Sequence, residues 1–223
     1  MVMENSLRDK MQPRLVPPWL WRAVVMAFAL VVMTGVTTAL WLGTRPALTG
    51  VAVPLPDPGR WTFGPGAAGE EADGSITVRA TGRASGLFYA VSEQPLADFA
   101  LEARAAPLSG PDDTGYGLMV RYRGLDDFVA LLIGPDGYIA VGQMSGGEWR
   151  WRVPWQPWPH IKRGSTENLL RAQCRADRCR FYVNDEFAFE VSGVPGEGQI
   201  GFAVWNPGGS NVSAAFRQWQ AWR

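Results

Sequence analysis

Four tryptophans lie within ten positions, between Trp149 and Trp158, and they are the most distinctive candidates for chemistry in the 223-residue sequence. Alternate residues of a strand share a face. The apolar residues of this segment therefore lie opposite its arginines: Trp149, Trp151, Val153 and Trp155 on one face, Arg150 and Arg152 on the other. In one interpretation the alternate tryptophans fill a core and Trp158 closes its end. In the other, the four tryptophans and Trp205 form an exposed binding ledge that stacks on sugar rings or anchors a partner protein.

Carboxylate patterns suited to glycoside hydrolysis are missing. Such enzymes place two carboxyl groups on one face of a cleft, and alternate residues of one strand can supply them, as in a Glu-x-Asp-x-x-Glu pattern. Glu71 and Asp73 have the right spacing but no third acid. Glu186 and Glu190 fall on one strand face with phenylalanines on the opposite face, which predicts a hairpin strand with a solvated side. With His160 as the only imidazole, we expect no catalytic residue and no enzyme, a degenerate sugar hydrolase being the exception.

Metal ligands are equally scarce. One His and two Cys cannot fill the four positions of a structural zinc site. The acidic pairs Asp112-Asp113 and Asp126-Asp127 fall in expected loops, where they form turns or, alternatively, hold a weakly bound calcium ion. We expect no metal and no other cofactor, with calcium as the one alternative. Zero net charge, from 21 basic and 21 acidic side chains, also argues against a nucleic-acid binder.

Cys174 and Cys179 bracket the four-residue loop Arg175–Arg178. If the apolar segments on either side pair as a hairpin, the two cysteines are cross-strand neighbours about 4.5–5.5 Å apart, which is within disulfide range. We predict a disulfide between them, which is compatible with an oxidising compartment.

Period-two alternation predicts the elements that hold these side chains after residue 60. Twelve short segments look like strands: Ser75–Ala80, Gly86–Val91, Asp98–Ala105, Tyr116–Arg123, Phe128–Ile133, Tyr138–Gln143, Glu148–Val153, Glu167–Cys174, Cys179–Asn184, Phe187–Val191, Gln199–Val204 and Val212–Trp222. Turn signals rich in Gly, Pro, Asn and Asp separate them. The pattern predicts an all-β, antiparallel sandwich or barrel over residues 61–223.

The order and spacing of several motifs in this region resemble a known family. They are Tyr116-Gly117-Leu118-Met119-Val120-Arg121, Asp136-Gly137-Tyr138, Ile161-Lys162-Arg163-Gly164, Cys179-Arg180-Phe181-Tyr182-Val183-Asn184 and Gly198-Gln199-Ile200-Gly201. Together they are similar to the concanavalin A-like, laminin-G-like jelly-roll domains of bacterial surface proteins, and to the related 3-keto-disaccharide hydrolase module. The resemblance covers about Asp57 to Trp222 and implies a jelly-roll sandwich, but it specifies no activity.

Residues 19–43 are predicted to form a transmembrane helix. Leu20–Leu42 is a run of 23 residues with one charge, and at 1.5 Å per residue it would cross a ~30 Å hydrocarbon core. Trp19, Trp21 and Trp41 stand at its ends, where indoles settle among the lipid headgroups. Basic residues before the span predict a cytoplasmic N-terminus. The predicted organisation is a cytoplasmic tail over 1–18, the helix over 19–43, a Pro-rich tether over 44–60 and an extracytoplasmic domain over 61–223.

These features predict a non-catalytic, single-pass accessory subunit at the cell membrane. Its outer sandwich would bind partner proteins in a larger bacterial membrane complex, such as a respiratory or photosynthetic electron-transfer complex. The alternative is a surface-anchored carbohydrate-binding module or a degenerate glycoside hydrolase-like protein. The expected partners are the lipid bilayer and integral membrane and extracytoplasmic subunits, or a polysaccharide in the alternative.

Overall fold

The computed structural model describes residues 26–27, 60–72, 74–82, 84–194 and 196–223. This described part contains fourteen strands: β1 (Trp61–Phe63), β2 (Ala67–Ala72), β3 (Ser75–Ala80), β4 (Gly86–Leu96), β5 (Phe99–Ser109), β6 (Gly115–Tyr122), β7 (Asp127–Ile133), β8 (Tyr138–Ser145), β9 (Glu148–Pro157), β10 (Asn168–Arg175), β11 (Arg178–Val183), β12 (Glu186–Ser192), β13 (Gly198–Asn206) and β14 (Ser213–Trp222). Twelve of them overlap the predicted segments, whereas β1 and β2 were not predicted.

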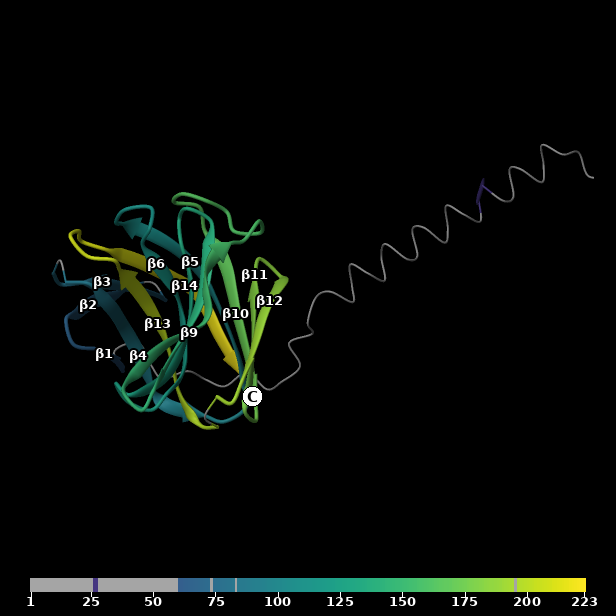
Figure 1. The fold of residues 1–223 in the computed structure, drawn as a ribbon, viewed down its shortest axis with the longest axis horizontal. Coiled ribbons are helices and arrows are strands. Elements are labelled where there is room, and N and C mark those ends of the chain that lie inside the picture. Colours follow the sequence, from purple (N-terminus) through teal and green to yellow (C-terminus); the bar gives the residue numbers. More distant parts are fainter. Residues whose placement is uncertain (1–25, 28–59, 73, 83, 195) are drawn as a thin grey trace, which may run out of the picture. The chain divides into compact units, whose positions relative to one another are not determined.

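The strands form two seven-stranded sheets (Figure 1). Sheet I has the order β1-β4-β13-β6-β7-β8-β9, and sheet II has the order β12-β11-β10-β5-β14-β3-β2. All strand pairs in both sheets are antiparallel. The predicted all-β antiparallel sandwich is therefore confirmed, with a jelly-roll-like order in which β13 lies between β4 and β6.

Apolar residues on the facing sides of the two sheets form the core. Leu118, Val129 and Phe202 of sheet I are each 0% exposed, as are Leu101 and Phe216 of sheet II. The rings of Phe202 and Phe216 stack between the sheets with centroids 4.6 Å apart. Burial of a side chain of this size stabilises the folded state by about 1.5–3 kcal/mol.

Sheet I also buries apolar side chains on its outer face. Strand residues alternate between the two faces, but β6 and β7 carry almost uninterrupted apolar runs. Met119 and Phe128 alternate with core residues, yet they are only 0% and 3% exposed and form a separate cluster with Tyr89, Val91 and Ala203. An apolar run without alternation is typical of a strand covered on both sides. The outer face of sheet I is therefore covered by other parts of the chain.

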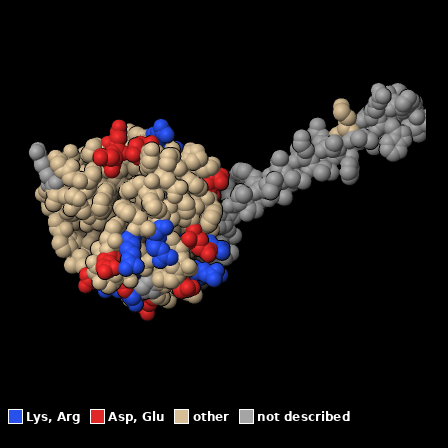
Figure 2. Space-filling model, viewed as in Figure 1, with Lys and Arg blue, Asp and Glu red and all other residues tan. Residues whose placement is uncertain are grey.

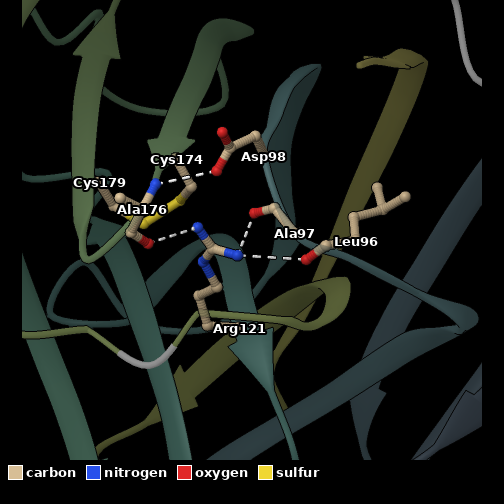
Figure 3. Close-up of a disulfide and its surroundings, with 7 residues drawn as sticks. All are labelled: Leu96, Ala97, Asp98, Arg121, Cys174, Ala176 and Cys179. Atoms are coloured by element: carbon tan, nitrogen blue, oxygen red, sulfur yellow. Dashed lines mark hydrogen bonds between the residues drawn. A yellow bond between two sulfur atoms is a disulfide. The ribbon is translucent and has the colours of Figure 1, made fainter.

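Cys174 and Cys179 form the predicted disulfide, with their Cα atoms 4.1 Å apart. They face each other in the register of β10 and β11, and both are 0% exposed. The turn between them is held at Ala176 (Figure 3). The Ala176 N–H donates to Asp98 Oδ1 at 2.9 Å, and the Ala176 carbonyl accepts from Arg121 Nη2 at 3.0 Å. The disulfide thus closes a hairpin of sheet II that Arg121 connects to sheet I.

Replacing both cysteines with alanine is expected to lower the free energy of unfolding by about 2 kcal/mol. The disulfide joins residues with a sequence separation of 5, and the chain-entropy model gives about 2 kcal/mol for so short a loop. Urea denaturation of the oxidised parent and of the double variant measures the difference. An unchanged midpoint would show that the hairpin holds equally well without the bond.

Basic and acidic residues pair on the outer surface of sheet II. Arg171 forms ion pairs with Glu102 and Asp185, and Arg180 forms one with Glu190. Basic and acidic side chains also lie next to one another along the lower part of the face drawn in Figure 2. Opposite charges therefore offset one another locally as well as in the whole sequence, where the net charge is zero.

The predicted localisation at the cell membrane is wrong, because no helix among the described residues is long and apolar enough to cross a bilayer. The expected span over 19–43 lies outside the described residues except for Met26 and Ala27. Trp19, Trp21 and Trp41, predicted at the membrane interfaces, also lie outside them. The segment boundaries at residues 18 and 43 are likewise outside the described part and are not tested.

Candidate functional site

Four tryptophans from two strands meet on the outer face of sheet I. Trp149, Trp151 and Trp155 belong to β9, and Trp205 belongs to β13. Between ring centroids, Trp151 lies 5.1 Å from Trp149, 5.8 Å from Trp155 and 5.8 Å from Trp205. Trp149 and Trp205 are 6.2 Å apart. We call these four partly exposed residues the tryptophan cluster.

The cluster reaches across the middle of sheet I. Strands β6, β7 and β8 separate β9 from β13, which corresponds to about 19 Å in a flat sheet at ~4.8 Å per strand. Ring centroids 5.8–6.2 Å apart therefore require the sheet to curve and the indoles to extend over the central strands. Trp149 lies 6.0 Å from the ring of Phe128 on β7. The tryptophans thus help to cover the outer face of sheet I, which accounts for the low exposure of Phe128.

Two glycines make room for the indoles. A Cβ atom at Gly142, on β8, would lie 2.0 Å from Trp149 Cζ2. A Cβ atom at Gly115, on β6, would lie 3.0 Å from Trp155 Cη2 and 2.9 Å from Trp205 Cβ. These glycines let the rings approach the backbone of the central strands closely. The positions of the rings are therefore set by the sheet beneath them as well as by their own strands.

A pair of tyrosines borders the same face. The hydroxyls of Tyr89 and Tyr122 are hydrogen-bonded at 2.9 Å, and both rings pack near Phe128. Burial, and after it the hydrogen bond with Tyr122, raises the pKa of Tyr89 well above its ordinary value. The raised pKa keeps Tyr89 neutral into the alkaline range as well, so it adds no charge to this apolar face.

Irregular pairing in β9 changes which of its residues share a face. The register between β8 and β9 shifts twice, and a bulge adds a residue that breaks the alternation. Val153 therefore packs against the core between the sheets, which corrects the prediction that it shares a face with the neighbouring tryptophans. Arg152 donates to Gln143 Oε1 at 2.6 Å and to the Ser192 carbonyl at 2.9 Å, which connects β9 to sheet II.

Trp158 does not belong to the tryptophan cluster. It packs against the core, with its ring 5.5 Å from that of Phe189 and 5.8 Å from that of His160. Its backbone N–H donates to the Gly137 carbonyl at 2.9 Å. Trp158 therefore helps to close the core, whereas Trp149, Trp151 and Trp155 lie on the outer face of sheet I. The contacts of Trp158 fit the interpretation in which it closes the core, and its binding role stays a prediction.

The central strands of this face present small or apolar side chains. The outward positions of β6, β7 and β8 include Gly115, Gly117, Met119, Tyr122, Phe128, Ala130, Leu132, Tyr138, Ala140, Gly142 and Met144. Glu186 and Glu190 lie on β12 of sheet II, where Glu190 pairs with Arg180. A register shift in β12 leaves Phe187 52% exposed while Phe189 packs against the core. This corrects the expectation that both phenylalanines occupy one face.

The described residues contain no group of three or more His, Cys, Asp or Glu side chains that could hold a metal ion. Asp127, from one of the acidic pairs considered for calcium, forms an ion pair with Arg123. His160 is exposed in the segment after β9. The chemistry that this site offers is therefore that of aromatic surfaces.

Solved structures with a similar arrangement of sheets identify the fold. One is the carbohydrate-binding module CBM66 from Bacillus subtilis, with a TM-score of 0.60, 17% identity and coverage of 74% of this chain and 96% of that one. A second is the Bacillus licheniformis beta-glucanase, with a TM-score of 0.56, 11% identity and coverage of 78% of this chain and 98% of that one. A third is a prokaryotic beta-1,3-1,4-glucanase (lichenase) derived from a mouse hindgut metagenome. Its TM-score is 0.51 and its identity 12%, with coverage of 78% of this chain and 97% of that one. The fold is a concanavalin A-like jelly roll.

This jelly-roll fold confirms the broad part of the resemblance found in the sequence. A scan of protein-family models and a search of curated proteins found no match to the sequence, so the narrower likeness to the 3-keto-disaccharide hydrolase module stays a prediction. The similar jelly rolls include a carbohydrate-binding module and glucanases. The comparisons give no support to the predicted accessory subunit of a membrane complex.

Proposed function

We propose that this chain is a non-catalytic carbohydrate-binding protein and that the tryptophan cluster is its sugar-binding surface. The observation that carries the proposal is the gathering of four partly exposed indoles on the outer face of one sheet, from β9 and β13. The similarity to a carbohydrate-binding module and to glucanases supports a sugar as the ligand. A polysaccharide is the expected partner.

Indoles and sugars are complementary because each combines an apolar face with polar groups at its edge. A sugar ring carries C–H groups on its faces and hydroxyls around its rim, so one face can pack on an indole while the hydroxyls stay in water. Tryptophan offers a large, rigid contact area and loses little conformational entropy on binding. Ligand sites are generally lined by aromatic and apolar side chains with few polar groups, which is the composition of this face.

Hydrolysis would need groups that this face does not offer. Glycosidases use two carboxyl groups about 5–9.5 Å apart on either side of the bond that is cleaved. Among the described residues, the outward positions of β6, β7 and β8 named above are Gly, Ala, Leu, Met, Phe or Tyr, none of which is a carboxylate. Trp149 and Trp155 also lie close over Gly142 and Gly115 of these strands. These features support binding without bond cleavage.

Trp151→Ala is expected to weaken the binding of a soluble glycan about tenfold or more. Trp151 contacts the three other rings of the cluster, so its loss removes one stacking face and loosens its neighbours. For nucleic-acid bases, stacking on an aromatic side chain contributes about 1–3 kcal/mol, and a tenfold loss corresponds to about 1.4 kcal/mol. A broad panel of soluble glycans identifies a ligand of the full chain, and titration calorimetry then compares the variant with the parent.

Phe187→Ala provides the matched control. Phe187 is an aromatic residue of β12 in the opposite sheet, is 52% exposed and contacts Tyr182 rather than the tryptophan cluster. The affinity of this variant is expected to equal that of the parent. Retention of no glycan from the panel would overturn the proposed function, as would a Trp151→Ala variant that binds as tightly as the parent.

A further inference from the structure

The rings of the tryptophan cluster face in different directions. Trp149 and Trp205 are nearly parallel, with 13° between their planes. Trp151 contacts both but stands at 87° to Trp149 and at 73° to Trp205. Trp155 is tilted by 58° relative to Trp151. The planes of the four rings therefore have at least three different orientations, and the rings do not form one flat platform.

Packing fixes these directions. Trp149 lies against Gly142 so closely that a Cβ atom there would be 2.0 Å from the ring, and Trp155 lies similarly close to Gly115. The register shifts of β9 fall between Trp151 and Gln156 in the pairing with β8, and a bulge increases the local twist of a strand. This twist accounts for the different tilts of Trp151 and Trp155. Bringing all four rings into one plane would break their contacts with the central strands.

A crystalline polysaccharide and a single chain make different demands on such a surface. The face of a crystal presents many parallel sugar rings at once, so a protein that binds it needs several indole faces in one plane. A single hydrated chain presents one sugar after another and can rotate about each glycosidic bond. Consecutive sugars of that chain can therefore meet rings that differ in direction by 58–87°.

We infer that the tryptophan cluster takes a single glycan chain, in soluble or amorphous form, and does not take the planar face of a crystalline polysaccharide. The inference rests on the proposed function and narrows the class of its ligand. Trp151 carries the distinction because its plane stands at 87° to Trp149 and at 73° to Trp205, whereas these two are nearly parallel to each other. A flat surface therefore cannot lie on the ring faces of Trp151 and of Trp149 or Trp205 at the same time.

Crystalline and non-crystalline forms of the same polymers test the inference. The full chain is incubated with microcrystalline and acid-swollen cellulose, with crystalline chitin and soluble chitin fragments, and with the panel of soluble glycans. We expect retention on at least one soluble or amorphous form, and at least tenfold weaker retention on every crystalline form. Trp151→Ala and Trp155→Ala should each weaken the binding of the soluble form, and Phe187→Ala should leave it unchanged.

The outcomes separate this inference from the proposed function. Retention on a crystalline form that equals or exceeds retention on its soluble form, and that Trp151→Ala lowers, would overturn the inference and leave carbohydrate binding intact. Retention on no form of any polymer would overturn the proposed function and the inference with it. Binding that is confined to soluble or amorphous chains supports both.

Discussion

Replacing Arg121 with methionine is expected to lower the free energy of unfolding by about 4 kcal/mol. Arg121 is 0% exposed and has the largest volume among the fully buried side chains. Its Nη1 donates to the carbonyls of Leu96 and Ala97, and its Nη2 donates to that of Ala176 (Figure 3). These carbonyls lie where β4 leads into β5 and where β10 turns into β11. One guanidinium of sheet I therefore holds two connections at one end of the sandwich.

The expected effect is large because the acceptors are backbone groups that stay in place when the arginine is removed. Burial lowers the pKa of Arg121, while the charges of Asp98 and Glu197 act in the opposite direction. The guanidinium also lies 5.4 Å from the centroid of the Phe99 ring. Methionine fills much of the same volume but donates no hydrogen bond. The bond to the Leu96 carbonyl is buried, and a buried carbonyl left without a donor costs about 1–3 kcal/mol. The bonds to the carbonyls of Ala97 and Ala176 are part-buried, and their loss removes two further hydrogen bonds from a charged donor, each of which contributes about 1.5–3 kcal/mol.

Arg180→Met is the matched control for this prediction. The Arg180 side chain is 57% exposed and pairs with Glu190, and exposed ion pairs contribute about 0–1 kcal/mol. Urea denaturation of the parent and both variants gives the difference. Asp98→Ala removes the acceptor of the Ala176 N–H and should cost about 1 kcal/mol, which keeps the role of this contact measurable if Arg121→Met does not fold. An Arg121→Met variant within about 1 kcal/mol of the parent would contradict the prediction.

The placement of Arg121 was not visible in the sequence. Alternation predicted a strand over Tyr116–Arg123, and β6 indeed covers Gly115–Tyr122, but an arginine near the end of a strand looks like a surface residue. In the structure Arg121 has a φ of 56° and lies at a register shift between β6 and β13. A positive φ is uncommon for residues other than glycine. It results here from pairing between distant strands, which a local pattern does not reveal.

Local patterns were sufficient for most strands and for the disulfide. Cys174 and Cys179 were predictable because a short hairpin fixes its own cross-strand pairs. Strands β1 and β2 were missed for a physical reason. Ala67–Ala72 consists of Ala, Gly and Glu, which are depleted in strands, and Trp61–Phe63 has only three residues. Pairing with β3 and β4 places these two segments in the sheets.

The tryptophan cluster could be predicted only in part. Alternation brought Trp149 and Trp151 to one face, and Trp205 was considered as an extension of the same ledge. The bulges that turn Val153 to the core are not encoded by alternation. The approach of β9 to β13 depends on the curvature of the whole of sheet I. The close contact between Trp149 and Gly142 was not predicted either. A glycine within a strand indicates that some group approaches its backbone closely, but the sequence does not identify that group.

Gly142→Ala is expected to displace Trp149 and to lower the free energy of unfolding by about 3 kcal/mol. The new Cβ would lie 2.0 Å from Trp149 Cζ2 and 2.2 Å from Cη2, so the whole indole must move. Trp149 is held by Phe128, Trp151 and Trp205, and it therefore cannot move without disturbing the cluster. Near-ultraviolet circular dichroism reports the tryptophan environment, and urea denaturation reports the stability. If the cluster binds glycans as proposed, the affinity should fall at least tenfold.

A double-mutant cycle separates this steric clash from a general intolerance of alanine at Gly142. In a Trp149→Leu background the clashing ring atoms are gone, so Gly142→Ala should cost less than about 1 kcal/mol, and the two substitutions should be strongly non-additive. Gly196→Ala is the control, because a Cβ there would meet nothing within 4 Å; neither stability nor the spectrum should change by more than a small amount. If Gly142→Ala lowered the free energy of unfolding equally in both backgrounds, the penalty would not come from Trp149, and the predicted clash with its ring would be contradicted. A penalty that disappears with the ring would show that the absence of one methyl group on β8 determines where Trp149 lies, and with it the arrangement of the surface proposed to bind sugars.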